Sequence, residues 1–128
     1  MSSERKELGK WGESVAREFL TDLGYKIETA NFRTRRGEID LVCWDKENVV
    51  FVEIKTFKSN LFKTPQEGYS NRQQNNLRRM AEIYLIKQSY KKEPVGIRFD
   101  FVGIKNVAGK TEITHLKNIT IGDSRHSE

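Results

Sequence analysis

The segment GEIDLVCWDKENVVFVEIK, residues 37–55, constrains the fold more than any other part of the chain. Apolar and polar residues alternate on both sides of a short polar stretch, which predicts a β-hairpin with its turn at the centre. Because side chains alternate along a strand, each strand presents two faces of different character. The first strand carries Glu38, Asp40, Val42 and Trp44 on one face, and Ile39, Leu41 and Cys43 on the other.

A two-residue turn at positions 46 and 47 would set the register of this hairpin. It places Asp40 opposite Glu53, and Glu38 opposite Lys55, on a single face of the sheet. Like charges in direct cross-strand contact destabilise a sheet, so the Asp40–Glu53 pair needs compensation. A divalent cation with oxygen ligands is the simplest candidate. In the alternative interpretation, Glu38 and Lys55 form an ordinary cross-strand ion pair and the other two carboxylates are solvated.

The predicted layout suits the hydrolysis of phosphodiester bonds. Two carboxylates would hold Mg²⁺, which lowers the pKa of a bound water and neutralises charge that develops at the phosphate. Lys55 follows Glu53 by two residues and would orient that water or stabilise the developing charge. Short motifs of this kind also occur on ordinary surface strands, so at this point both interpretations stay open.

The rest of the chain completes an α/β pattern. Apolar residues at helical spacing predict helices over 4–24 and 71–89, and alternation predicts strands over 25–32, 38–45, 48–57, 97–104 and 111–116. The expected fold is a central mixed β-sheet flanked by helices, in the order α-β-β-β-α-β-β. Residues 1–118 are expected to form one domain, followed by a C-terminal tail at 119–128.

Composition and charge narrow the class of partner. The 128 residues carry a net charge of +5, which favours a polyanionic partner such as nucleic acid. The single cysteine, Cys43, cannot form an internal disulfide, and no apolar run is long enough to span a membrane. We therefore expect a cytoplasmic protein without a membrane partner. His115 and His126 are isolated in the sequence, so no zinc site is expected.

Beyond these patterns, GEIDLV followed by FVEIK resembles the PD-(D/E)xK nuclease superfamily, whose members share the restriction-endonuclease-like fold. More narrowly, the chain resembles the YraN-like family of small bacterial proteins, on the segments GKWGESVAREFLTDLGYKI, NFRTRRGEIDLV, VVFVEIKT and RFDFVGI. This family is close in pattern to archaeal-type Holliday-junction resolvases. The resemblance implies a Mg²⁺- or Mn²⁺-dependent endonuclease acting on DNA, on branched or single-stranded structures. Resolvases of this fold act as dimers, so a homodimer is a further expectation.

Two alternatives from other functional classes stay open. One is a nucleic-acid-binding protein that keeps the restriction-endonuclease-like fold but has little or no catalytic activity. The other is a structural or adaptor domain whose acidic cluster is only a salt-bridge network. The chain retains both the acidic pair and the lysine, which favours the nuclease over these alternatives.

The resemblance also implies roles for individual residues. Asp40 and Glu53 match the acidic metal ligands, and Lys55 matches the catalytic lysine. The backbone carbonyl of Ile54 would complete a site for one or two Mg²⁺ or Mn²⁺ ions. Glu13, on the first helix, matches a glutamate that lies near the metal in related resolvases, so it is expected among the catalytic residues and metal ligands.

Other polar residues would surround this catalytic set. Glu38 is expected to support Lys55 or the metal ligands. Asp100, on a later strand, would either support the site or pair with Arg98. Basic residues near the acidic strands are expected to contact phosphates of the nucleic acid; they are Arg33, Arg35, Arg36, Lys58 and Arg72.

Overall fold

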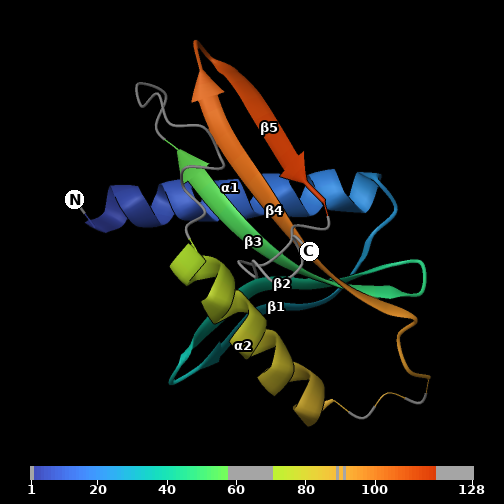
Figure 1. The fold of residues 1–128 in the computed structure, drawn as a ribbon. Helices are drawn as coiled ribbons and strands as arrows, with labels where there is room; N and C mark the ends of the chain where they lie inside the picture. The colour runs from blue at the N-terminus through green and yellow to red at the C-terminus, as the bar shows by residue number, and fades with distance from the viewer. Residues whose placement is uncertain (1, 58–70, 89, 91, 118–128) are drawn as a thin grey trace.

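The structure is a computed structural model that describes residues 2–57, 71–88, 90 and 92–117 (Figure 1). It contains the helices α1 (Ser2–Asp22) and α2 (Asn71–Lys87) and the strands β1 (Lys26–Thr34), β2 (Gly37–Asp45), β3 (Asn48–Phe57), β4 (Gly96–Val107) and β5 (Lys110–Leu116). This order and the mixed sheet confirm the predicted fold class. Lys58, His126 and the predicted tail at 119–128 lie outside the described residues.

The five described strands form one sheet in the order β1-β2-β3-β4-β5. β3 and β4 are parallel, with α2 in the connection between them, and the other neighbours are antiparallel. α1 covers one face of the sheet and α2 lies on the other (Figure 1). In the part of the chain that the structure describes, neither helix has the length and apolar character needed to cross a membrane.

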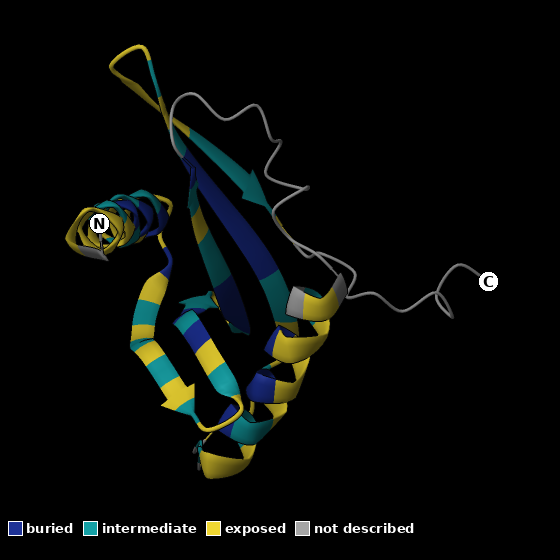
Figure 2. Ribbon diagram, turned by 90° about the vertical axis from the view of Figure 1, so that its left-hand side faces the viewer, coloured by how far each residue is buried: buried dark blue, intermediate teal, exposed yellow. Residues whose placement is uncertain are grey.

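The core consists of two layers, one on each face of the sheet, and both helices turn their buried residues inward (Figure 2). The layer beneath α1, the α1 layer, includes Ala16, Leu20, Leu41, Val52 and Ile104. The layer beneath α2, the α2 layer, includes Ile39, Phe51, Leu77, Tyr84 and Phe101.

A glycine follows the last turn of α1, which ends at Asp22. Gly24 has a φ of +98°, a left-handed conformation that glycine adopts without steric cost. Its N–H donates to the carbonyl of Thr21 at 2.9 Å, and the N–H of Tyr25 donates to the carbonyl of Leu20 at 3.0 Å. These bonds satisfy carbonyls at the end of the helix and direct the chain into β1.

α1 also approaches β3 closely, at Gly12. A Cβ atom at this position would lie 1.9 Å from Oγ1 of Thr56, so only glycine fits the contact without a shift. The next residue, Glu13, is half-buried at the same place. The close contact therefore positions one of the candidate site residues against the sheet.

The hairpin of β2 and β3 has the register that the sequence predicts. Its paired residues run from Asp45 opposite Asn48 to Leu41 opposite Val52. Lys46, in the two-residue turn, has a φ of +59°. The alternation of apolar residues and the turn length were therefore sufficient to predict the pairing.

The ladder stops one residue short of the candidate site. The predicted pairs of Asp40 with Glu53, and of Glu38 with Lys55, are not part of it. Beyond this point β2 remains paired with β1, and β3 remains paired with β4. The sheet therefore opens into two arms, which diverge in Figure 1. We call the place where β2 and β3 separate the split.

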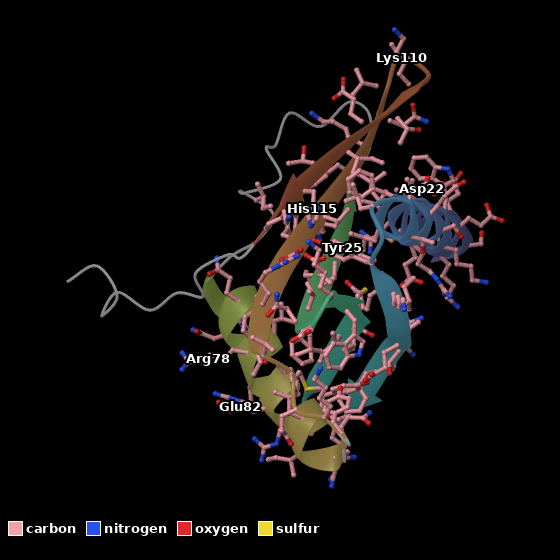
Figure 3. All side chains as sticks on the ribbon, turned by 90° about the vertical axis from the view of Figure 1, so that its right-hand side faces the viewer. Asp22, Tyr25, Arg78, Glu82, Lys110 and His115 are labelled. Atoms are coloured by element: carbon pink, nitrogen blue, oxygen red, sulfur yellow. The ribbon has the colours of Figure 1, made fainter. Side chains whose placement is uncertain are left out.

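A buried charged network joins β4 to β5 and to the segment after α1 (Figure 3). Asp100 is fully buried; Oδ2 accepts hydrogen bonds from Arg98 Nη2 at 3.0 Å and Tyr25 Oη at 3.4 Å, and lies 2.7 Å from His115 Nε2. Arg98 Nη1 donates to Oδ2 of Asp45 at 2.6 Å. The predicted Asp100–Arg98 pair is confirmed. The expectation that His115 is isolated is wrong, because β5 pairs beside β4 and brings its ring to Asp100.

The contact at Gly12 leads to a prediction about two glycines of the same helix. Gly12→Ala should lower the free energy of unfolding by about 1–3 kcal/mol, the usual cost of overpacking a tight contact. Adding Thr56→Ala should recover part of the loss, because it removes the nearest atom. Gly9→Ala is the control: nothing lies within 4 Å of its added Cβ, and it should stabilise α1 by up to about 1 kcal/mol. Urea unfolding measures all of these variants, and equal effects at the two glycines would contradict the close packing.

The charged network leads to a second stability prediction. Arg98→Met should lower the free energy of unfolding by about 3 kcal/mol, because it leaves Asp100 and Asp45 without their cation in a buried environment. Lys92→Met is the matched control. Lys92 pairs with Glu47 at 3.9 Å on the surface, where an ion pair contributes about 0–1 kcal/mol. Urea unfolding measures both variants. If their free energies of unfolding fall by similar amounts, burial of the Arg98 pairs does not make them more stabilising than a surface pair.

Candidate functional site

The side chains of β2 stop alternating at Asp40. Ile39 packs in the α2 layer, whereas Leu41, two residues later, packs in the α1 layer. The same change of face occurs in β1, where Ala30 packs toward α1 and Phe32 packs toward α2. The prediction that Ile39 shares a face with Leu41 is therefore wrong, and the break falls at the candidate metal ligand.

Asn31 gives a local reason for this break. It has a φ of +57°, in the left-handed region that asparagine tolerates better than most residues. Phe32 pairs with Ile39 and Ala30 pairs with Leu41, so Asn31 lies across from Asp40. The backbone is therefore distorted in β1 beside the residue at which β2 changes face.

Asp40 provides the acceptor that the interrupted ladder lacks. In a continued ladder Ile54 would lie opposite Ile39, but its N–H donates instead to Oδ2 of Asp40 at 2.7 Å. This bond satisfies a backbone donor where the strands separate. The N–H and C=O of a strand residue point toward the same neighbouring strand, so the carbonyl of Ile54 also faces the split.

Burial raises the pKa of Asp40 to about 6. The hydrogen bond from the Ile54 amide opposes this rise, because it favours the charged form. The charges of Glu38 and Glu13 raise the pKa further, and the charge of Arg33 lowers it. Asp40 therefore lies in an acidic and desolvated environment, to which both a strand and a helix contribute.

The pKa of Glu53 is raised further, to about 8, again mainly by burial. The negative charges of Asp40 and Glu38 add to this rise, and the positive charge of Lys55 opposes it. At neutral pH, Glu53 therefore holds a proton when no cation is present. The repulsion expected between the two carboxylates is relieved in this way.

The structure thus brings the predicted catalytic residues into one electrostatic neighbourhood. Glu13 reaches it from α1, Asp40 from β2, and Glu53 and Lys55 from β3. Glu38 lies in the same neighbourhood but does not pair with Lys55. Its Oε1 lies 3.0 Å from Nε of Arg33, with both side chains largely exposed.

The donor set of the split fits a hard divalent cation in part. Its candidate ligands are all oxygen atoms, which Mg²⁺ and Mn²⁺ prefer. In the described ranges, no three His, Cys, Asp or Glu side chains are grouped so that they could hold a metal ion. Mg²⁺ is often bound by only one or two carboxylates together with waters and substrate phosphates, so the pair of Asp40 and Glu53 with the Ile54 carbonyl is compatible with it.

Four of the predicted phosphate-contacting residues are described by the structure, and they lie on β1, on the β1–β2 turn and on α2. Arg35 and Arg36 form the exposed turn between β1 and β2, and Arg72 is exposed in the first turns of α2. Arg33 is engaged by Glu38. Sequence analysis overlooked Arg79, which is exposed two helical turns after Arg72. Its spacing from Arg72 was the available signal, because residues seven apart lie on one side of a helix.

Comparison with known proteins assigns the chain to a family. A model of the family described as uncharacterised protein family UPF0102 matches residues 12–104, which include all the candidate catalytic residues. The chain belongs to the UPF0102 family. UPF0102 proteins of Syntrophomonas wolfei and Desulforamulus reducens are 45% and 37% identical to it, over 88% and 92% of this chain and 96% and 98% of their own. The UPF0102 protein of Alkaliphilus oremlandii is 35% identical to it, over 88% of this chain and 97% of its own.

Membership of UPF0102 confirms the YraN-like family expected from the sequence. The names of these UPF0102 relatives state a family and no activity. The reaction is therefore inferred from the residues of the site.

The raised pKa of Glu53 gives a prediction about stability and pH. The folded protein holds this proton up to about pH 8, whereas the unfolded chain releases it near pH 4.5. The contribution of Glu53 is therefore fully present below pH 4.5 and is lost as the pH rises through 8. Glu53→Gln, which cannot ionise, should be more stable than wild type at about pH 9, by on the order of 1 kcal/mol or more.

The measurement is urea unfolding of both proteins between about pH 5 and pH 9, without divalent cations. The advantage of Glu53→Gln should grow with pH and be smallest at the acid end. Glu112→Gln, on the exposed part of β5, is the control and should follow wild type. Parallel curves for wild type and Glu53→Gln would contradict the desolvated, acidic environment of Glu53.

Proposed function

We propose that this UPF0102 protein is a metal-dependent nuclease that hydrolyses phosphodiester bonds in DNA, on branched or single-stranded structures. The observation that supports this most is the split itself: two desolvated carboxylates with raised pKa values lie beside a lysine where β2 and β3 separate. A protein that used these residues only for stability would have little reason to bury two carboxylates together, because desolvation disfavours their charged forms.

In this proposal, Asp40, Glu53 and the Ile54 carbonyl hold Mg²⁺ or Mn²⁺. The bound cation would supply positive charge at the scissile phosphate and make the attacking water more acidic. The amide of Ile54 donates to Oδ2 of Asp40 and keeps this carboxylate in place. The other oxygen of the carboxylate would then bind the cation. Glu53 must lose its proton to act as a ligand, so cation affinity should rise with pH up to about 8.

Lys55 and Glu13 complete the proposed site. Lys55 is exposed beside Glu53, where its ammonium group would stabilise negative charge at the phosphate during bond breaking. The charge of Glu13, on α1, is close enough to raise the pKa of Asp40, and in this proposal its carboxylate would hold a water or a second cation. Glu38 keeps Arg33 near the split through their ion pair.

The second candidate is a protein that binds nucleic acid through the same surface without cleaving it. The absence of a three-carboxylate group from the described residues favours this alternative, because it leaves the cation with few protein ligands. The two functions share the basic surface and differ only in the role of the split.

A cleavage assay separates these two functions. Wild type with Mg²⁺ or Mn²⁺ should cut at least one of four labelled DNA substrates: duplex, single strand, flap or four-way junction. Asp40→Asn and Lys55→Ala should each lower the rate by about 10²- to 10³-fold, as expected for the loss of one charge-stabilising group. Lys110→Ala, an exposed change at the turn between β4 and β5, should leave the rate unchanged.

Thermal melts with Mn²⁺ distinguish the roles of the two residues. Wild type and Lys55→Ala should be stabilised by the cation, because it binds only the folded state. Asp40→Asn should lose this stabilisation, although it can still accept the Ile54 hydrogen bond through its amide oxygen. If wild type binds DNA but shows neither cleavage nor a Mn²⁺-dependent shift, the binding protein is the correct alternative.

A further inference from the structure

The tip of the β1–β2 hairpin is docked against the middle of α2. Oγ1 of Thr34 donates to Sδ of Met80 at 3.3 Å. Gly37 has a φ of +153°, and a Cβ atom there would lie 3.5 Å from Cγ of Met80 and 3.6 Å from Nδ2 of Asn76. The hairpin tip and this part of α2 therefore form one continuous surface, although they are far apart in the sequence.

Four exposed arginines lie on this surface. Arg35 and Arg36 belong to the hairpin tip, and Arg72 and Arg79 flank Asn76 on α2, one helical turn before it and one turn after it. In the parts of the chain that the structure describes, none of these four makes an ion pair with a carboxylate. Within the described residues, no carboxylate neutralises their charges.

Two neighbouring arginines differ from these four. Arg33 is bound to Glu38 at 3.0 Å, so part of its charge is already neutralised. Arg78 lies on the other side of α2 from the hairpin and has an interaction of its own. It projects away from the sheet together with Glu82 (Figure 3). The unpaired positive charge is therefore concentrated on the side of α2 that faces the hairpin.

We infer that Arg35, Arg36, Arg72 and Arg79 form a phosphate-binding ridge, which holds the backbone of a nucleic-acid strand beside the split. This inference rests on the proposed function for the identity of the partner. The planar guanidinium group binds a phosphate through two parallel hydrogen bonds, so a row of arginines suits a repeating polyanion. Nucleic acid is favoured over an anionic membrane because the hairpin tip lies on the same strand as Asp40 of the acidic split, three residues before it.

The dimensions of β2 set the scale of this contact. Gly37 precedes Asp40 by three residues, which corresponds to roughly 10 Å along the strand. Nucleotides of one DNA strand are spaced by about 3.4 Å along the helix axis. The ridge would therefore hold phosphates some three or more nucleotides from the one at the split. Such contacts position a strand without reading its sequence.

The test measures binding of the full-length protein to a short labelled duplex and to the matching single strand, in EDTA, over a range of salt concentrations. Two double variants remove either half of the ridge: Arg72→Ala with Arg79→Ala, and Arg35→Ala with Arg36→Ala. The matched control is Lys26→Ala with Lys110→Ala, which removes the same charge from exposed positions away from the hairpin tip and α2. Circular dichroism and thermal melts establish that each variant is folded.

Each ridge variant should weaken binding at least tenfold at about 0.1 M salt, and should lower the slope of log K against log salt by about two for duplex DNA. The control should change the affinity for DNA less than about threefold. The affinity of Arg33→Ala should be closer to that of the control than to that of the ridge variants. If the Arg72 and Arg79 variant binds no more weakly than the control, the ridge is wrong.

Other outcomes separate the ridge from the nuclease. If wild type needs the ridge for binding but never cleaves DNA, the ridge is supported and the proposed reaction is not. If cleavage depends on Asp40 while the ridge variants bind like the control, only the ridge is overturned. Binding to phosphatidylserine vesicles that requires Arg72 and Arg79, without any binding to DNA, would also overturn it.

Discussion

The hydrogen bond from the Ile54 amide to the Asp40 carboxylate is the interaction on which the arrangement of the site depends. A sheet cannot open between two strands without leaving backbone groups unpaired, and unpaired buried groups are costly. Asp40 solves this problem at the first position beyond the ladder. The same bond orients the Asp40 carboxylate toward β3. The side chain that allows β2 and β3 to separate therefore also lies in the split between them.

The opening creates an electrostatic problem, which the rest of the protein offsets. Burial of Asp40 and Glu53 raises both pKa values, which means that the folded state disfavours their charges. Local destabilisation of this kind persists only where the surrounding structure is well determined. Here the tight contact of α1 at Gly12 and the buried network around Asp100 hold the sheet on the α1 face. Residues outside the candidate site therefore supply stability that offsets the local cost of burying these carboxylates.

Local patterns in the sequence were enough to predict the elements, their order and the register of the central hairpin, because alternation and turn length act over short distances. They could not predict the break at Asp40, which coincides with the left-handed backbone of Asn31 in the neighbouring strand. The association of His115 with Asp100 depends on strand pairing. The spacing of Arg72 and Arg79 within one helix could be read from the sequence, but the position of that helix face beside the hairpin depends on the docking of the hairpin on α2. The break and the His115 contact involve contacts between elements rather than a pattern within one.

The acidic split and the basic surface next to it also explain how a polyanion could approach these carboxylates. If Asp40, Glu53 and Glu38 were all ionised, their three negative charges would repel a phosphate backbone. Because Glu53 holds its proton up to about pH 8, the split carries less negative charge in the absence of a cation. The charge of the arginines on the hairpin and α2 does not change with pH in this way, since arginine remains charged at every physiological pH. In the proposed function, affinity for a strand and reactivity toward it would then be set by separate residues.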